Sequence, residues 1–246
     1  MILFVTGGSR GIGASIVHEA IRQGHDVAFS YLRRQQQARD VMAQAREIDR
    51  TRRCLAYQLD VRDSAAVERV ADAVIDEFGT VNGVVANAGV NANGLAATMS
   101  DEDWSLVIDT NLTGTFYVCR QFLPTLLANG GGRIVMVSSV SYAGMSGMAN
   151  YAASKAGLLG LSATLAREYG PKGITSNVVI PGFFDTEMTQ DSMSDALKEY
   201  WVRLCPLRRL GERDEVASVI LFLVSDAARF VTGQAIPVTG GLDWAP

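Results

Sequence analysis

The sequence predicts an α/β fold in which a doubly wound parallel sheet of about seven strands carries helices on both faces. Short apolar segments alternate with helical segments along the chain. The apolar segments are continuous and lack the alternation of a half-exposed strand, so each is expected to be buried on both faces. No linker, repeat or low-complexity segment divides the chain, so residues 1–246 are expected to form one domain.

Each apolar run between turn residues is an expected strand. In chain order the strands are residues 2–6, 26–31, 54–59, 83–86, 133–138, 175–180 and 235–238. The expected helices are residues 11–23, 35–49, 64–78, 101–128, 150–169, 192–203 and 214–225. Ile12, Ile16 and Ala20 place one apolar stripe on the first helix, the second is polar, and Ser64 is the expected N-cap of the third.

One long irregular stretch, residues 181–206, interrupts this alternation. Long loops in compact domains usually serve as lids or binding loops. We therefore expect this stretch, together with the helix that it contains, to cover a substrate.

Composition excludes several classes of protein. Of the 246 residues, 48% are hydrophobic and 20% are charged, a balance that is ordinary for a folded globular protein. The net charge of −4 and the pI near 5.3 provide no basic surface for nucleic acid or an anionic membrane. The apolar start is too short for a signal peptide, and no apolar run reaches the ~18 residues of a membrane helix. A cytoplasmic protein without a nucleic-acid or membrane partner is expected.

Cysteine and histidine usage predicts no metal site. Cys54, Cys119 and Cys205 are scattered and form neither a disulfide framework nor a zinc pattern. The two histidines, His18 and His25, lack the spacing of metal ligands. The cysteines are expected to be free, buried thiols.

A glycine-rich turn separates the first expected strand from the first helix. Glycine allows a tight turn and lets backbone amides approach a phosphate, and the amino end of the helix adds partial positive charge. Its place between a strand and a helix favours a dinucleotide-binding turn over an ordinary loop. The expected contact residues are Gly7, Ser9, Arg10, Gly11, Ile12 and Gly13.

The residues around the second strand favour NADP(H) over NAD(H). In the NAD-binding form of this fold, an acidic residue near the end of that strand bonds the ribose 2′-hydroxyl. Here the strand ends at Tyr31, Arg33 and Arg34 follow it, and Arg10 lies in the glycine turn. A carboxylate would repel a 2′-phosphate, whereas guanidinium groups pair with it. The alternative interpretation of Arg33 and Arg34 is a solvated helix start.

Tyr151 and Lys155 are four residues apart, which places them on one face of the expected helix 150–169. A nearby ammonium favours the phenolate and lowers the pKa of a tyrosine. A tyrosine tuned in this way can give a proton to an alkoxide as a hydride reaches a carbonyl carbon. We expect Tyr151 to be the proton donor and Lys155 to be its activating partner.

These motifs resemble those of the short-chain dehydrogenase/reductase family. The glycine spacing is GxxxGxG, and the YxxxK pair opens the helix after the fifth strand. Asn87-Ala88-Gly89 corresponds to the family's NNAG motif, with Ala86 in place of its first asparagine. The resemblance covers nearly the whole chain and implies an NADP-dependent oxidoreductase with a Rossmann-type sheet.

The resemblance implies further site residues. Asn111 would hold a water that links Lys155 to solvent. The remaining cofactor contacts would come from loops that follow the third, fourth and sixth strands: Asp60, Val61, Asn87, Ala88, Gly89, Pro181, Gly182 and Thr186.

A serine at the end of the fifth strand would bond the substrate carbonyl. Counting along the strand selects Ser139, whereas counting back from Tyr151 selects Ser138. The interval from Ser139 is one residue shorter than is usual in the family. We take Ser139 as the catalytic serine and keep Ser138 as the alternative.

The C-terminal motifs 206–211, 232–234 and 239–241 resemble those of the branch that contains 3-oxoacyl-[acyl-carrier-protein] reductases. That resemblance implies reduction of a 3-oxoacyl thioester with NADPH in fatty acid or polyketide biosynthesis, by a homotetramer or, alternatively, a dimer. Basic residues often precede the fifth strand in that branch, but residues 127–132 carry no charge, although Lys172 is present. Thioesters of acyl carrier protein or coenzyme A and free ketones therefore stay open as substrates.

Apolar residues near the expected site are candidates for the substrate pocket, with loop packing or a subunit interface as the alternative: Tyr142, Met145, Met148, Phe183, Phe184 and Trp201.

Two other functions remain open. One is an NADP-dependent alcohol or sugar dehydrogenase. The other is a non-catalytic NADP-binding sensor, because fold alone does not fix function; the presence of both Tyr151 and Lys155 argues against a sensor.

Overall fold

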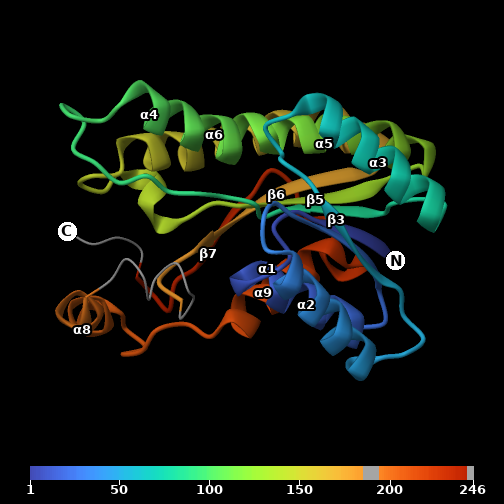
Figure 1. Cartoon of the computed structure of the whole chain (residues 1–246), viewed down its shortest axis with the longest axis horizontal. Coiled ribbons are helices and arrows are strands. Elements are labelled where there is room, and N and C mark those ends of the chain that lie inside the picture. Colours follow the sequence, from blue (N-terminus) through green and yellow to red (C-terminus); the bar gives the residue numbers. More distant parts are fainter. Residues whose placement is uncertain (185–193, 243–246) are drawn as a thin grey trace.

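A seven-stranded parallel sheet forms the centre of the molecule (Figure 1). The computed structural model describes residues 1–184 and 194–242. The strand order is β3-β2-β1-β4-β5-β6-β7, and every neighbouring pair is parallel. The strands are β1 (Ile2–Val5), β2 (Asp26–Tyr31), β3 (Cys54–Gln58), β4 (Gly83–Ala86), β5 (Gly132–Val137), β6 (Ile174–Pro181) and β7 (Ala235–Val238). The predicted fold class is confirmed.

Helices cover both faces of this sheet (Figure 1). On one face lie α1 (Gly11–Arg22), α2 (Gln35–Ile48) and α9 (Arg213–Val224). On the other lie α3 (Ser64–Phe78), α4 (Asp101–Ile108), α5 (Gly114–Ala128) and α6 (Ala149–Tyr169). The short helix α8 (Asp195–Leu204) lies to one side of both layers. The chain thus winds in both directions from the middle of the sheet, as crossovers of one hand require.

Buried apolar side chains fill the space on both faces of the sheet. Successive residues of a strand point to opposite faces. Leu3 and Val5 accordingly pack with the α1, α2 and α9 layer, whereas Phe4 packs on the other side, with its ring 4.6 Å from that of Phe122. All three strand residues are fully buried, which explains why the segment is continuously apolar.

The long helix expected over residues 101–128 is interrupted. A π-helical turn, η1 (Asp109–Thr113), separates α4 from α5. Such turns insert one extra residue into a helix, and they are frequent at functional sites. Asn111, one of the predicted site residues, lies within this turn.

The prediction of Ser64 as an N-cap is wrong. Asp63 caps α3, and its carboxylate accepts hydrogen bonds from the amides of Ala65 and Ala66. Both residue types cap well, so propensity alone does not choose between neighbours.

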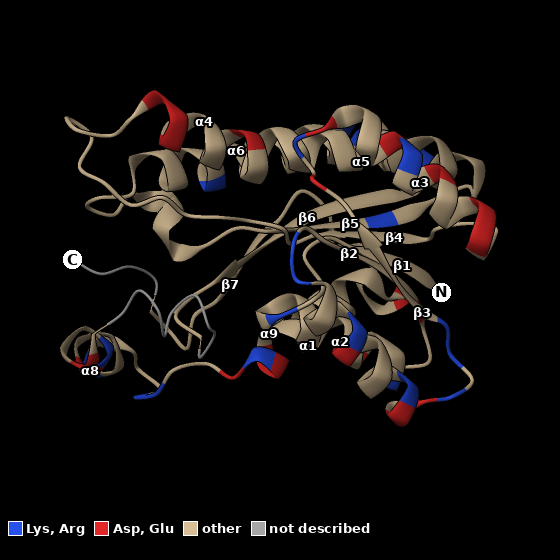
Figure 2. Ribbon diagram, in the orientation of Figure 1, with Lys and Arg blue, Asp and Glu red and all other residues tan. Residues whose placement is uncertain are grey.

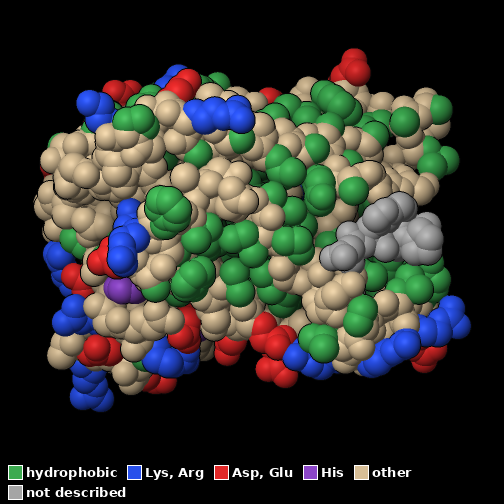
Figure 3. Space-filling view, turned by 180° about the vertical axis from the view of Figure 1, so that it is seen from behind, with side chains coloured by type: hydrophobic (Ala, Val, Ile, Leu, Met, Phe, Trp, Pro, Cys, Tyr) green, Lys and Arg blue, Asp and Glu red, His purple; other side chains and the backbone are tan. Residues whose placement is uncertain are grey.

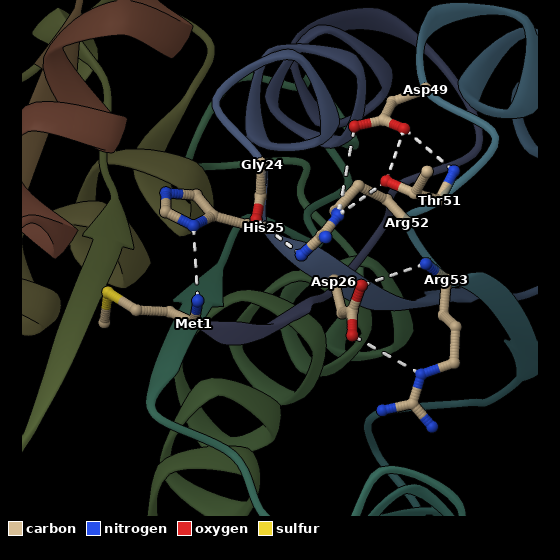
Figure 4. A network of polar contacts seen from close by, with 8 residues as sticks. All are labelled: Met1, Gly24, His25, Asp26, Asp49, Thr51, Arg52 and Arg53. Atoms are coloured by element: carbon tan, nitrogen blue, oxygen red, sulfur yellow. Dashed lines mark hydrogen bonds and ion pairs between the residues drawn. The ribbon is translucent and has the colours of Figure 1, made fainter.

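Charged residues lie mostly on the helices and loops (Figure 2), and Asp26 and Arg133 are the only charged residues in the described strands. A polar network closes the edge of the sheet where β1, β2 and β3 begin (Figure 4). The Asp26 carboxylate accepts hydrogen bonds from the amide and the Nε of Arg53, and the amino terminus contacts His25 at 3.5 Å. The charges at this edge therefore serve largely to join neighbouring strands.

Over residues 1–184 and 194–242, no helix is long and apolar enough to cross a membrane. The same residues contain no group of three side chains that could hold a metal ion. Cys119 and Cys205 are buried and Cys54 is half-buried, and all three are free thiols. Burial raises the pKa of Cys54 and of Cys119 to about 12, which disfavours the reactive thiolate.

Candidate active site

The neighbours β1 and β4 continue into helices on opposite faces of the sheet. Such a point of reversal leaves a crevice at the carboxyl ends of the strands, where ligands bind in folds of this kind. The predicted site residues follow these ends: residues 7–13 after β1, Tyr31 at the end of β2, Asp60 after β3, residues 87–89 after β4, Ser139 after β5 and Pro181 at the end of β6. The sheet thus brings the cofactor and catalytic candidates to one edge.

The glycine turn has a backbone that a side chain would disturb. Gly7 has a φ of 68° and Gly11 a φ of 55°, in the region that glycine tolerates best. At Gly13 a Cβ atom would lie 2.1 Å from the carbonyl oxygen of Gly7. Only a residue without a side chain lets α1 begin this close to the turn.

The amino end of α1 fits a phosphate group. Arg10 precedes the helix in extended conformation, and its side chain does not cap the first helical amides. The first turn of α1 also contains no acidic residue, and space is open beside Gly11. Uncapped amides at the positive end of a helix are an anion-binding arrangement, so this turn is suited to the phosphates of a dinucleotide.

Thr6 joins the two loops on either side of the crevice, a role that the sequence motifs did not suggest. Its hydroxyl oxygen accepts hydrogen bonds from the amides of Asn87 (3.0 Å) and Ala88 (2.9 Å). In return, Asn87 Nδ2 donates to the carbonyl oxygens of Thr6 and Gly7 at 3.0 and 3.3 Å. Asn87 therefore holds the glycine turn in place.

Asp60, one of the predicted cofactor contacts, is paired with Arg62. The Arg62 Nη2 lies 2.6 Å from a carboxylate oxygen of Asp60, and the Nε donates to the same group. These hydrogen bonds lower the pKa of Asp60, and Arg33 acts on it electrostatically in the same direction. Val61 is buried against Gly114, where a Cβ would lie 2.7 Å from Val61 Cγ2. Arg62 is a charged residue of this region that the motifs did not identify.

Tyr151 and Lys155 lie on one face of α6, with Lys155 Nζ 5.6 Å from the centre of the Tyr151 ring. Lys155 is only 4% exposed, and its Nζ donates to the carbonyl oxygen of Val137 at 2.8 Å. Burial lowers the pKa of Lys155 to about 8. The ammonium is therefore still the main form at neutral pH.

In the protein alone, the pKa of Tyr151 is raised. Burial raises it, and a hydrogen bond with Ser139 lowers it by a smaller amount. The phenol is thus protonated at neutral pH, as a proton donor must be. The expected lowering by Lys155 is not among the effects that act on this residue here.

The two candidate serines have different surroundings. The Ser138 hydroxyl is buried and donates to the main-chain carbonyl of Lys155 at 3.0 Å. The Ser139 hydroxyl bonds with Tyr151 and accepts from the Ser141 amide at 3.2 Å. Because the Ser138 hydroxyl is engaged with the helix backbone, the geometry favours Ser139 as the serine that faces a substrate.

Asn111 is fully buried beside Lys155. Its Oδ1 accepts from the Val90 amide at 2.8 Å, and its Nδ2 donates to the Val90 carbonyl and to Ser154 Oγ, both at 3.0 Å. Between them passes Gly89, where a Cβ would lie 3.4 Å from Lys155 Nζ and 3.3 Å from Asn111 Oδ1. Asn111, Gly89 and Lys155 therefore form one tight cluster.

The loop after β6 is anchored at its start. The Gly182 amide donates to the Val238 carbonyl at 2.9 Å. Phe183 stacks on Trp201 of α8 with ring centres 4.3 Å apart, whereas Phe184 is 4% exposed and packs in the core against Gly211. For Phe184 the packing interpretation thus agrees better with the structure than the pocket interpretation.

The other candidates divide between two loops. Tyr142, Met145 and Met148 are half-buried, and Met148 pairs with Gly94 in an isolated bridge. Thr186 lies outside the described residues.

Known proteins resemble the chain over nearly its full length. The family described as enoyl-(acyl carrier protein) reductase matches residues 7–243. The 3-oxoacyl-[acyl-carrier-protein] reductase FabG of Staphylococcus aureus (strain Mu50) is 40% identical over 241 residues, 97% of this chain and 96% of that protein. FabG of Chlamydia trachomatis serovar D is 39% identical over 240 residues, 97% and 95% of the two chains. Levodione reductase superimposes with a TM-score of 0.96 at 28% identity, covering 100% of this chain and 98% of the other.

Proposed function

The chain is an oxidoreductase that belongs to the short-chain dehydrogenase/reductase family, and on this basis we propose that it reduces a 3-oxoacyl thioester to the 3-hydroxyacyl thioester with NADPH. The observation that carries the proposal is the meeting of Ser139, Tyr151 and Lys155 at the sheet edge that also holds the glycine turn. The likeness to FabG supports a thioester substrate, on acyl carrier protein or a related carrier.

In this proposal the bound nicotinamide supplies a hydride to the ketone carbon. Ser139 donates a hydrogen bond to the carbonyl oxygen and orients the ketone. Tyr151, kept protonated by burial, gives its proton to the oxygen as negative charge develops there. The Lys155 ammonium stabilises the phenolate that remains, and Asn111 keeps Lys155 and the neighbouring loop in register.

Cofactor binding is assigned to the turns along the same edge. The amides of the glycine turn, residues 7–13, would hold the pyrophosphate, and Asn87, Ala88 and Gly89 would line the path of the dinucleotide. Tyr31, Asp60 and Val61 would surround the adenosine, and Arg10 and Arg33 would face the 2′-phosphate. Pro181, Gly182 and Thr186 would lie over the nicotinamide.

The first experiment measures NADPH oxidation with acetoacetyl-coenzyme A for the wild type and for Tyr151→Phe. Removal of the phenol proton should lower kcat by about 100-fold or more, because general acid catalysis contributes ~10²–10⁴. Tyr57→Phe removes a hydroxyl from β3 and is the matched control, which should retain the wild-type rate. Wild-type turnover that persists in Tyr151→Phe would contradict the assignment of the proton donor.

Cofactor choice is tested at Arg33. Arg33→Ala should raise the KM for NADPH by about 10-fold or more, since a charge-assisted bond to the 2′-phosphate contributes ~1.5–3 kcal/mol. The KM for NADH should not change, and Arg39→Ala, another exposed arginine nearby, should leave both constants unchanged. An equal rise for NADH and NADPH would count against a 2′-phosphate contact.

A second candidate function is reduction of a ketone that is not a thioester. The close superposition with levodione reductase supports it. The same assay should therefore include a cyclic diketone, and an enoyl thioester because the matching family carries an enoyl reductase description. NADPH binding without turnover of any of these compounds would favour the sensor alternative.

We infer that the protein assembles from several copies, a tetramer or a dimer. Apolar side chains gather on one broad face of the molecule (Figure 3). Among the exposed large apolar residues, Phe230 is 100% exposed and Phe222 is 47% exposed. Large exposed apolar areas mark interaction sites in soluble proteins, which supports contact with further copies of the chain.

A further inference from the structure

We infer that Asn150 is a positioning residue for Tyr151. Its side chain connects the first turn of α6 to the loop after β4 and to α4. The inference rests on the proposed role of Tyr151 as proton donor. Asn150 is fully buried. Its Nδ2 donates to the carbonyl oxygens of Ala92 at 3.0 Å and Asp103 at 3.1 Å. Its Oδ1 accepts from the Tyr151 amide at 2.7 Å. Both N–H groups and the oxygen of this side chain are therefore in use.

The position of Asn150 in its helix makes this arrangement unusual. It is the second residue of α6, and the side chain of Met148, the residue before the helix, does not cap it. The first amides of a helix lack partners within the helix. Asn150 satisfies the one that belongs to Tyr151, and at the same time connects it to two other segments. A buried asparagine has poor helix propensity and loses its hydration on folding, so packing alone does not account for its presence here.

A second buried side chain holds the main-chain carbonyl of Tyr151. Ser154 Oγ donates to the Tyr151 carbonyl at 2.8 Å and accepts from Asn111 Nδ2 at 3.0 Å. Asn111 in turn holds Val90 by two hydrogen bonds. The amide and the carbonyl of Tyr151 are thus each linked by buried side chains to the loop after β4, through Ala92 and Val90 respectively.

This double link fixes the phenol relative to Lys155. The loop after β4 also brings Gly89 against Lys155 Nζ, so one segment sets the position of both members of the pair. The charge near Tyr151 is that of Lys155, and the hydrogen bond to its side chain comes from Ser139. Loss of the Asn150 link frees the first turn of α6 and lets the phenol move away from Ser139 and from the ammonium.

The test compares Asn150→Ala with the wild type in the oxidation of 3-hydroxybutyryl-coenzyme A over a range of pH. We expect kcat to fall by about 10-fold to 100-fold, because small misplacements of a reacting group cost this much. The KM for NADP should change little. The pH midpoint of the reaction should rise, since a phenol displaced from Ser139 loses the hydrogen bond that lowers its pKa.

Asn177→Ala is the matched control. Asn177 is also fully buried and also links two segments through its side chain, by bonds to the Val231 carbonyl and the Gln234 amide. It should lose stability in the same way but keep the wild-type kcat and pH midpoint. Asn150→Ala with a wild-type midpoint, and with kcat reduced only by the fraction unfolded, would overturn the inference.

A second variant and a second readout keep the test independent of folding and of turnover. Asn150→Leu keeps the branched shape and adds no charge but loses both donors and the acceptor, and it should show the same upward shift. Ionisation of Tyr151 can be followed directly as tyrosinate absorbance, with Tyr151→Phe as the blank. If the wild type turned over no substrate, the proposed function would fail, but this titration would still decide whether Asn150 sets the pKa of Tyr151.

Discussion

Lys155 carries its charge in a position that is almost closed to water. It is 4% exposed, and its one hydrogen bond within the described chain goes to the carbonyl oxygen of Val137. Burial without a carboxylate partner disfavours the ammonium, which is why the pKa falls from 10.5 to about 8. The proposed chemistry needs that charge beside Tyr151, so the fold bears a cost in stability at this residue.

Lys155→Met should therefore stabilise the protein while abolishing activity. In the folded state the lysine binds its proton less tightly than in the unfolded chain. The charged lysine therefore lowers the free energy of unfolding by its full amount below pH ~8. This loss of stability shrinks as the pH rises and vanishes above ~10.5. Allowing ~1 kcal/mol for the lost hydrogen bond, the gain in the free energy of unfolding near pH 7 should be about 2 kcal/mol. Urea denaturation at pH 7 and pH 10 measures it; a gain that grew with pH would contradict this account.

Single residues differ in how far the sequence could define their roles. The spacing of Tyr151 and Lys155 predicts a shared helix face, and α6 has them there. The choice between Ser138 and Ser139 depends on which hydroxyl the backbone of α6 engages, and no spacing rule contains that contact. Thr6 and Arg62 were missed because a threonine after a strand and an arginine in a loop are common, and only their partners give them a role.

The start of α1 depends on a glycine without room for a side chain. Gly13→Ala should destabilise the protein by about 1 to 3 kcal/mol, the usual cost of overpacking, because the new methyl group meets the Gly7 carbonyl. It should also weaken NADPH binding, since the helix must move away from the turn. Urea denaturation and quenching of protein fluorescence by NADPH measure the two effects.

Gly170→Ala is the control for this change. Gly170 has a helical φ of −54°, and a Cβ there would meet nothing within 4 Å. The free energy of unfolding of Gly170→Ala should stay within ~1 kcal/mol of the wild-type value. If Gly13→Ala behaved like Gly170→Ala, the close approach of α1 to the turn would not be required.

Helices and strands were predictable to different degrees. Continuous apolar runs identified all seven described strands, with ends that differ by at most one residue from the observed ends. The segment 101–128 was expected to be one helix, whereas a π-helical turn divides it. Buried Asn111, whose bonds reach Val90 and Ser154, can be assigned to the turn only once α6 is in place.

At the scale of the whole molecule, exposed apolar side chains predict that copies of the chain associate. Phe230 has no shielding within the described chain, so Phe230→Asp should leave the stability of a single copy almost unchanged. If the exposed Phe230 ring joins copies, the variant should have a smaller mass in solution, measured by light scattering after size-exclusion chromatography. Phe230→Leu, which stays apolar, should assemble like the wild type. A wild type that is itself monomeric would contradict the inferred assembly.

The order of residues along the chain determined the strands, the glycine turn and the Tyr151–Lys155 pair, because each depends on neighbours within a few positions. Periodicity and backbone freedom are local properties, and they can be recognised in a single sequence. The contacts that join the site were decided by the folded molecule. Asn150 meets Ala92 across 58 positions, and Thr6 meets Asn87 across 81. Such bonds exist only after the parallel sheet has aligned the carboxyl ends of its strands, since a hydrogen bond forms only at short range and in the right direction.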